Sequence, residues 1–216
     1  MKISSRETIN DGYKGGYTVG GAPSSESYQI WDFLINKNKI KTFMDVGCGS
    51  GNSVKYMLEK NIDAYGIDGS ETVLSIGNVP PNRIIIHDYE KEEYIPKKTF
   101  DAMWSVEFVE HISEKNSKNF LSTYGFCKTL LITFATPGQG GHNHVNENTM
   151  DYWVDRIEKV GFKYNCVKTL FLKEITFLTE DIYSKYYSDL DRDYVERDYG
   201  LHIKKTLLCF DSTKII

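Results

Sequence analysis

The sequence predicts a single α/β domain in which a largely parallel sheet is covered by helices on both faces. Short apolar runs that suit strands alternate with amphipathic runs that suit helices, as in chains built from β-α-β units. The 216 residues are within the usual size of one domain, and no internal repeat or long Pro- or Ser-rich linker divides them. With 40% hydrophobic and 26% charged residues, the composition excludes a collagen-like or wholly disordered chain.

The first half of the chain carries the clearest alternation of elements. Residues 10–23 are rich in glycine and predicted to be irregular, and Ser24 or Ser25 is expected to cap a helix that runs to about Lys37. The strands expected next lie at 41–46, 64–67, 83–87 and 100–105, with helices at 52–60 and from about 70 onward.

The second half is predicted to complete the sheet. A helix is expected over 115–127, and the apolar run 129–135 is typical of a fully buried, central parallel strand. A glycine- and histidine-rich loop follows Pro137, and the next helix, over 149–160, ends at Gly161. Two closing strands are expected at 162–171 and 206–210, on either side of a polar, tyrosine-rich stretch at 180–200.

Charge and cysteine content narrow the partners and the compartment. Lys and Arg number 26 against 30 Asp and Glu, giving a net charge of −4, so the chain has no general attraction for nucleic acid or an anionic membrane. A local basic groove is still compatible with this composition. The four cysteines form no Cys-x-x-Cys pair and fall in apolar or glycine-rich runs that favour free thiols in strands. No secretory leader or membrane-length apolar run is recognised, so we expect a cytoplasmic protein.

The most informative run is Asp45-Val46-Gly47-Cys48-Gly49-Ser50-Gly51, at the end of a predicted strand. Alternating glycines allow positive φ and a close approach of backbone to ligand, and the following helix offers free N–H donors. The spacing is Gly-x-Gly-x-Gly rather than the Gly-x-Gly-x-x-Gly of a dinucleotide fingerprint. A carboxylate two residues before the first glycine would repel a pyrophosphate but attract a ligand with sulfonium and ammonium groups.

Acidic and polar residues at the ends of later strands extend this pattern into a family resemblance. Asp68 stands 17 residues after Gly51, where a carboxylate can accept both hydroxyls of a ribose. The run from Asp45 resembles motif I of the class I S-adenosylmethionine (SAM)-dependent methyltransferases, and Asp68 matches their ribose-binding acid. Asp88 follows the third strand, near the family's adenine site, and Ser105 ends a segment that resembles motif IV. The four segments keep the family's order over roughly residues 40–160.

The resemblance implies a Rossmann-like, doubly wound, seven-stranded and mostly parallel sheet, with SAM as cofactor. The cofactor-binding residues that it implies are Asp45, Gly47, Gly49, Gly51, Asp68, Asp88, Ser105 and Tyr17. The family usually closes its cofactor site with an N-terminal segment, so residues 1–23 are expected to form a lid arm whose Tyr13 or Tyr17 covers the methionine end. A disordered arm is the alternative.

The stretch 173–200 stands where the family's last two strands form a hairpin, so we expect an insertion there, within one domain of residues 1–216. The stretch is acidic, which disfavours a polyanionic acceptor beside it. A solvated helix or a dimer contact is expected in preference to a wall of the acceptor site.

A second group of residues follows the motif IV segment. Glu107, Glu110 and His111 are spaced to share one face of a helical turn, and a later strand-end loop carries His142 and His144. Both loops belong at the carboxyl ends of the strands, where such sheets bind ligands. A similar Glu-x-x-Glu-His segment with a downstream histidine binds metal in plant small-RNA 3′-terminal 2′-O-methyltransferases. That resemblance implies a divalent ion held by Glu107, Glu110, His111 and His144.

Two other interpretations of these residues stay open. The Glu-His pair can act as a cap and a buried hydrogen bond, and the histidine loop can bond its own backbone. Without a metal, His144, His142 or His111 would be the catalytic general base that removes the proton of an alcohol.

The function predicted is methyl transfer from SAM to a small-molecule acceptor, at an oxygen of a sugar or another metabolite. Ser105-Val106-Glu107-Phe108 replaces the Asn/Asp-Pro-Pro-Tyr segment of many nitrogen methyltransferases, which disfavours methylation of DNA bases or glutamine amides. The alternatives are metal-dependent RNA 2′-O-methylation, a non-catalytic SAM-binding protein, and a nicotinamide oxidoreductase, which Asp45 and the glycine spacing oppose.

Overall fold

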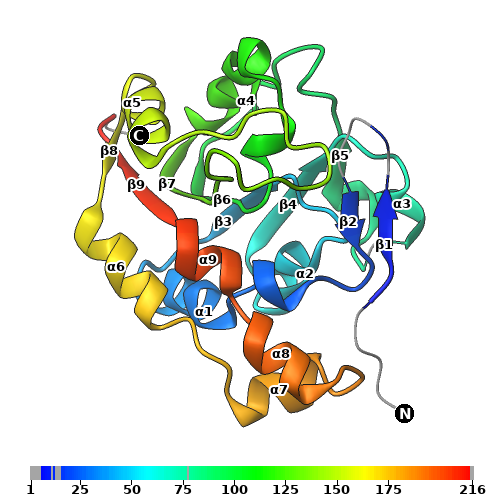
Figure 1. Ribbon diagram of the computed structural model, residues 1–216. Helices are drawn as coiled ribbons and strands as arrows, with labels where there is room; N and C mark the ends of the chain where they lie inside the picture. The colour runs from blue at the N-terminus through cyan, green and yellow to red at the C-terminus, as the bar shows by residue number, and fades with distance from the viewer. Residues whose placement is uncertain (1–5, 11, 13–15, 77, 215–216) are drawn as a thin grey trace.

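The central sheet has seven strands, and the computed structural model describes residues 6–10, 12, 16–76 and 78–214. Across the sheet, the strands follow the order β5 (Ile84–Ile86), β4 (Asp63–Asp68), β3 (Thr42–Val46), β6 (Phe100–Ser105), β7 (Cys127–Ile132), β9 (Leu208–Ser212) and β8 (Phe162–Tyr164). The first five run parallel, whereas β9 is antiparallel to both β7 and β8 (Figure 1). The predicted doubly wound, mostly parallel sheet is therefore confirmed, and the carboxyl ends of β3, β4, β6 and β7 meet along one edge.

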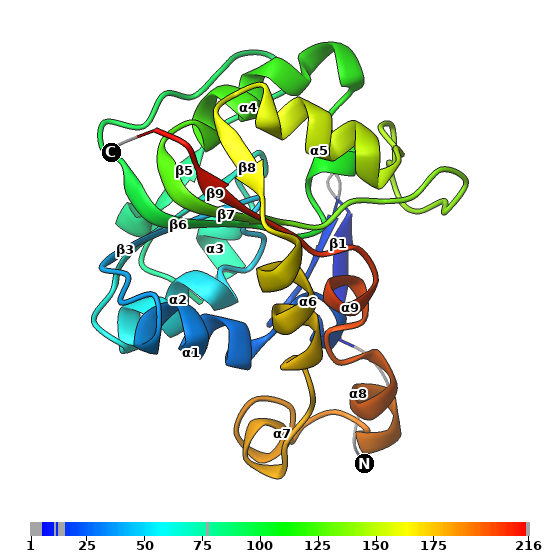
Figure 2. The ribbon, with the colours of Figure 1, turned by 90° about the vertical axis from the view of Figure 1, so that its left-hand side faces the viewer.

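Helices cover both faces of the sheet, which Figure 2 shows nearly on edge. One face carries α4 (Ser117–Tyr124) and α5 (Met150–Glu158), and the other carries α1 (Tyr28–Asn36) and α2 (Asn52–Glu59). Successive strand residues point to opposite cores: Phe43 packs with Trp31 on one side, and Met44 packs with Phe120 on the other. Because both faces are buried, the central strands are apolar throughout, as their sequences indicated.

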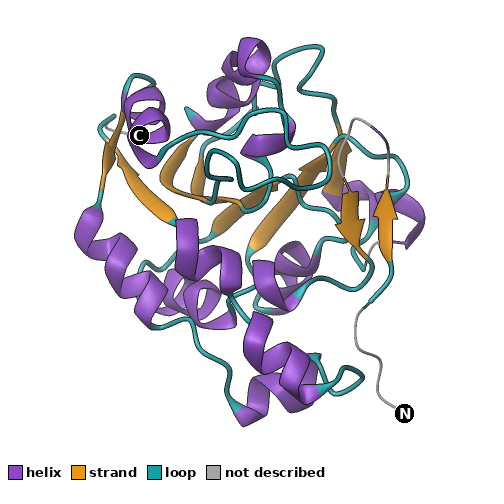
Figure 3. Ribbon diagram, viewed as in Figure 1, coloured by secondary structure: helices purple, strands orange, loops and turns teal. Residues whose placement is uncertain are grey.

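The segment between β8 and β9 is helical. It contains α6 (Cys166–Glu174), α7 (Glu180–Tyr186), α8 (Arg192–Asp198) and α9 (Leu201–Thr206), which extend beyond 173–200 on both sides (Figure 3). The predicted strand at 162–171 was wrong after Tyr164, because the Asn165 side chain accepts the Lys168 N–H and starts a helix there. Cys166 is exposed on that helix rather than buried in a strand.

The N-terminal region contains regular structure that the sequence did not indicate. A hairpin of β1 (Thr8–Asn10) and β2 (Gly16–Thr18) occupies part of the stretch predicted to be irregular. Ser27, rather than Ser24 or Ser25, caps α1 by accepting the Ile30 N–H. Tyr13 and the Tyr17 side chain lie outside the described residues.

Other boundaries shift by a few residues. The helix expected from about 70 is the short α3 (Val73–Ile76), and β5 is only half buried because it forms an edge of the sheet. Of the helices that the structure describes, none is long and apolar enough to span a membrane.

Candidate active site

A cavity of about 320 Å³ opens at the carboxyl ends of β3 and β6. The end of β3 contributes Asp45 to its lining, and the turn after β3 contributes Gly47. The N-terminal arm and the entry to α1 form one wall, and the segments after β6 and β7 form another. α9 adds His202, so the helical segment between β8 and β9 also contributes to this wall. The predicted site residues that line the cavity therefore lie at the carboxyl ends of the strands, as the sequence indicated.

The glycine turn after β3 requires glycine for two separate reasons. Gly47, Gly49 and Gly51 have φ values of 80°, 49° and 78°, a region that residues with a Cβ rarely adopt. A Cβ on Gly47 would also lie 2.5 Å from the Phe108 ring. The turn therefore holds its backbone close to the cavity, directly before the N-terminus of α2 at Asn52.

Asp45 faces this cavity from within the protein. It is 5% exposed and accepts a hydrogen bond from the Ser53 hydroxyl. Burial raises the pKa of Asp45 to about 7, with a further contribution from the Asp68 carboxylate. A cationic ligand beside Asp45 would reverse this effect by stabilising the carboxylate.

Four of the predicted cofactor residues do not line the cavity: Gly51, Asp68, Asp88 and Ser105. Asp68 accepts the N–H groups of Gly49 and Ser70, each at 2.9 Å, so it braces the glycine turn. Asp88 pairs with a lysine on the turn after β5. Ser105 is fully buried, donates to a β3 carbonyl and accepts from a tyrosine hydroxyl. Their predicted contacts with the cofactor stay predictions.

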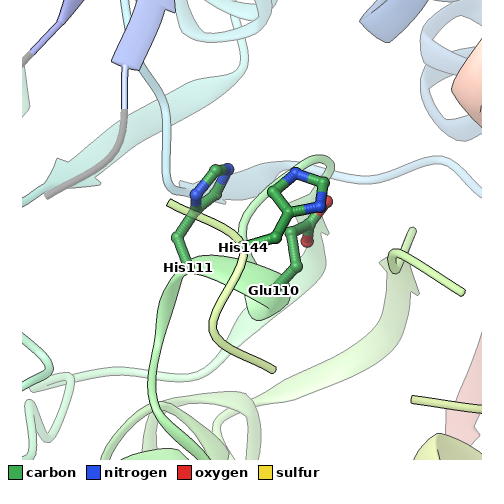
Figure 4. Close-up of side chains that lie close together, drawn as sticks. All are labelled: Glu110, His111 and His144. Carbon is green, nitrogen blue, oxygen red and sulfur yellow. The ribbon is translucent and has the colours of Figure 1, made fainter. Parts of the chain in front are cut away.

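Glu110, His111 and His144 come together at the far side of the cavity. Their potential ligand atoms all lie within 4.8 Å of one another (Figure 4). Glu110 and His111 belong to the 3-10 turn 109–111 after β6, and His144 lies in the loop after β7. Main-chain bonds from Val145 and Asn146 to the Glu110 carbonyl join the two segments.

The burial of these side chains fits a bound cation. Glu110 is 0% exposed, and its carboxylate has no hydrogen-bond partner of ordinary geometry among the described residues. Burial raises the pKa of Glu110 well above its usual value, and the Glu107 carboxylate adds to this. Burial also lowers the pKa of His111 to about 4, which keeps its imidazole neutral and able to coordinate a metal. A divalent ion would relieve the cost of burying an unpaired carboxylate.

Glu107 departs from the predicted arrangement. Its φ of 55° takes it off the turn, so the expectation that it shares a face with Glu110 and His111 was wrong. Its carboxylate instead lies 3.3 Å from the Thr133 hydroxyl and 3.3 Å from Nδ1 of His202. Burial raises the pKa of Glu107 to about 7.

Two histidines in the cavity wall complete this end of the site. His142 is exposed, and its Nε2 lies 2.7 Å from Oδ1 of Asn10 in the N-terminal hairpin. His202 was missed by the sequence analysis, because nothing near it in the chain resembles a motif. The small number of histidines could have drawn attention to His202. The chain has five histidines, and four of them line one cavity: His111, His142, His144 and His202.

Comparison with known proteins agrees with this architecture. Residues 44–124 match the family described as a methyltransferase domain. None of the curated proteins compared with the chain matches it. Among solved structures, a TehB-like SAM-dependent methyltransferase from Corynebacterium glutamicum is 18% identical with a TM-score of 0.52, over 65% of this chain and 76% of that one.

Two further structures cover more of the chain. An O-methyltransferase from a trans-AT PKS multienzyme of Brevibacillus brevis, in complex with S-adenosyl-L-homocysteine, is 15% identical with a TM-score of 0.54, over 85% of this chain and 70% of that one. The methyltransferase domain of bacterial CtHen1-C is 17% identical with a TM-score of 0.52, over 86% of this chain and 98% of that one. At these identities the likeness shows the fold.

Residues 44–124 thus match a methyltransferase domain, and the sheet has the fold of the solved SAM-dependent methyltransferases.

Proposed function

We propose that the protein transfers the methyl group of SAM to a hydroxyl oxygen of a small molecule, such as a sugar or another metabolite. One observation carries this proposal. The glycine turn with Asp45 and the histidines of the Glu110–His111–His144 cluster open onto the same cavity, so a methyl donor and a hydroxyl can meet between them.

Different residues would act at the two ends of the cavity, one set on the methyl donor and the other on the acceptor. SAM supplies an electrophilic methyl group on a sulfonium. Asp45 and the glycine turn would hold that cation, and the cavity walls would align the acceptor oxygen with the methyl carbon and exclude water. Alignment of this kind supplies much of the rate in a direct displacement. The hydroxyl must also lose its proton, which requires a base or a Lewis acid at the acceptor end.

We propose that Glu110, His111 and His144 hold a divalent ion at that end. Such an ion would lower the pKa of an acceptor hydroxyl. The resemblance also implies Glu107 as a metal ligand. Its carboxylate would have to move away from His202 to join the other three ligands. Without a metal, His144, His142 or His111 would be the base. The unpartnered carboxylate of Glu110 favours the metal.

A chelator experiment distinguishes these alternatives. Methyl transfer from labelled SAM to a panel of sugar and phenol hydroxyls should stop after chelation and return with Mg²⁺ or a transition metal. Glu110→Gln and His144→Ala should lose bound metal and activity but keep their affinity for S-adenosylhomocysteine (SAH). His87→Ala, a histidine outside the cavity, is the matched control. Full activity in the presence of chelator would contradict the metal proposal and leave the histidines as the candidate bases. SAH binding without methyl transfer to any acceptor would favour a non-catalytic protein.

RNA 2′-O-methylation is a second candidate. The observation that favours it is that three of the four residues implied by the small-RNA methyltransferase resemblance do come together. The net charge of −4 and the acidic inserted helices weigh against a polyanionic acceptor. A short RNA with a 3′-terminal 2′-hydroxyl, compared with the same RNA ending in a 2′-deoxynucleotide, tests it directly.

A further inference from the structure

Glu26 is a buried carboxylate in the wall of the cofactor cavity to which neither the sequence motifs nor the resemblance assigns a role. It lies just before α1, is 4% exposed, and lines the same cavity as Asp45. Gly21 lies beside it with φ 86°, and a Cβ on Gly21 would collide with Oε1 of Glu26. The chain thus leaves room for this carboxylate at the edge of the cavity.

The hydrogen-bond partners of Glu26 are neutral. The Asn52 amide donates to Oε1 at 2.8 Å, and the hydroxyls of Tyr187 and Tyr28 donate to Oε2. Within the described residues, no cation forms an ion pair with Glu26. Arg6 acts on it electrostatically, but the Arg6 guanidinium is bonded to Asp189 at 3.0 Å and to backbone carbonyls. A buried carboxylate with neutral donors only is costly unless a cation approaches it.

We propose that Glu26 binds the α-ammonium group of SAM. SAM carries two cationic centres, the sulfonium and the ammonium, and the cavity has two buried acids in its lining, Asp45 and Glu26. Asp68, which matches the family's ribose-binding acid, lies outside that lining, so the two acids belong to the amino-acid end of the cofactor. The inference rests on SAM as the cofactor and is independent of the acceptor.

The inserted segment holds Glu26 in place. Tyr187, directly after α7, is fully buried, and its hydroxyl bonds the carboxylate. Tyr199, after α8, accepts the Tyr28 N–H at 3.1 Å and so fixes the start of α1. Tyr187 is therefore a positioning residue, and the insertion contributes to cofactor recognition across a long separation in sequence.

Two ligands that differ only in the ammonium group test the proposal without any acceptor. They are SAH and its deamino analogue, 5′-S-(3-carboxypropyl)-5′-thioadenosine. Calorimetry on the wild-type protein should show SAH binding about 10- to 100-fold more tightly than the analogue, as expected for a charge-assisted hydrogen bond. Glu26→Gln keeps the shape and should reduce this ratio to about threefold or less while leaving the affinity for the analogue unchanged. Glu174→Gln, an exposed acid on α6, is the control and should keep the full ratio.

The other outcomes are distinct. The inference would be overturned if folded Glu26→Gln kept the ratio of the two affinities, or lost affinity for both ligands equally. Glu26 would then be a structural residue. If Glu26→Gln does not fold, Tyr187→Phe should reduce the same ratio, and an unchanged ratio there would count against the proposal. If the wild-type protein binds neither ligand, the cofactor assignment fails and the inference fails with it.

Discussion

At the proposed cofactor end of the cavity, Asp45, Gly47 and Gly49 come from the end of β3 and the turn after it, whereas at the proposed acceptor end Glu110, His144 and His202 come from three distant segments. The turn takes its shape from positive φ values that glycine adopts without strain. The acceptor end depends on tertiary contacts, such as the main-chain bonds from Val145 and Asn146 to Glu110 and the packing of α9 against α6 and the 3-10 turn 23–25.

This difference predicts different responses to substitution. Changes in the turn should act on cofactor binding through local backbone shape. Changes at the acceptor end should alter the acceptor reaction while cofactor affinity stays constant. Glu107 shows how a tertiary contact sets the backbone at the acceptor end. Although Glu107 has a Cβ, it is held at φ 55° by Thr133, whose hydroxyl oxygen accepts its N–H at 2.8 Å.

The largest effect is expected for Gly47→Val. The new side chain would meet Phe108 and would force a β-branched residue into the left-handed region, so SAH affinity should fall on the order of 100-fold. Gly140→Val is the matched control, because Gly140 has φ 67° but open space around its Cβ position. Calorimetry measures the binding, and circular dichroism checks the fold. Unchanged affinity in folded Gly47→Val would show that the turn does not approach the cofactor.

The next effect concerns the acceptor end. His202→Ala removes the partner of the Glu107 carboxylate and leaves it half satisfied, so kcat/KM for the acceptor should fall about tenfold. The dissociation constant for SAH should stay the same, as it should in the control Lys205→Ala on the same helix. A matching loss of SAH affinity would contradict the separation of the two ends.

Cofactor binding should depend on pH through Asp45. Its pKa is raised to about 7 in the free protein, and a cationic ligand needs the carboxylate. The affinity for SAM, which carries the sulfonium, should therefore fall as the pH drops below 7, by at most about tenfold per pH unit, with proton release seen by calorimetry in different buffers. Asp45→Asn should bind weakly and lose this dependence. A dissociation constant that is flat from pH 6 to pH 8 would rule out Asp45 as the titrating group.

The same raised pKa has the opposite consequence for the free protein. Because the folded pKa lies above the unfolded one, the contribution of Asp45 to stability is present at low pH and is lost as the pH rises toward 7 and beyond. Asp45→Asn should therefore narrow the difference in melting temperature between pH 5 and pH 8.

The smallest effect is expected at the contact between the N-terminal arm and the insertion. Arg6 bonds the Tyr186 carbonyl and Asp189, which is more than half exposed. Exposed ion pairs contribute about 0–1 kcal/mol, so Asp189→Asn should speed SAH dissociation by about two- to fivefold in stopped-flow measurements. Asp193→Asn, an exposed acid on α8, is the control. An unchanged rate would mean that the arm is not held over the cofactor by this contact.

The sequence by itself determined the parts of this protein that depend on neighbouring residues. The alternation of strands and helices, the glycine turn and its acid at Asp45 follow from local patterns of polarity and backbone freedom. The positive φ values of Gly47, Gly49 and Gly51 give the turn its local backbone shape, and the three glycines stand at alternate positions of its motif. The Glu-x-x-Glu-His segment also indicated the place where Glu110 and His111 meet His144, although not the position of the Glu107 side chain.

Only the tertiary structure decided which distant residues meet. His202 and Glu26 have no motif around them, and they reach the cavity because the helices between β8 and β9 pack against α1. The apolar residues after β8 predict a strand. The Asn165 cap and the burial of Leu172 against α1 instead make this run the helix α6. Such contacts join residues far apart in the chain, and their free energy comes from burial that no local pattern encodes.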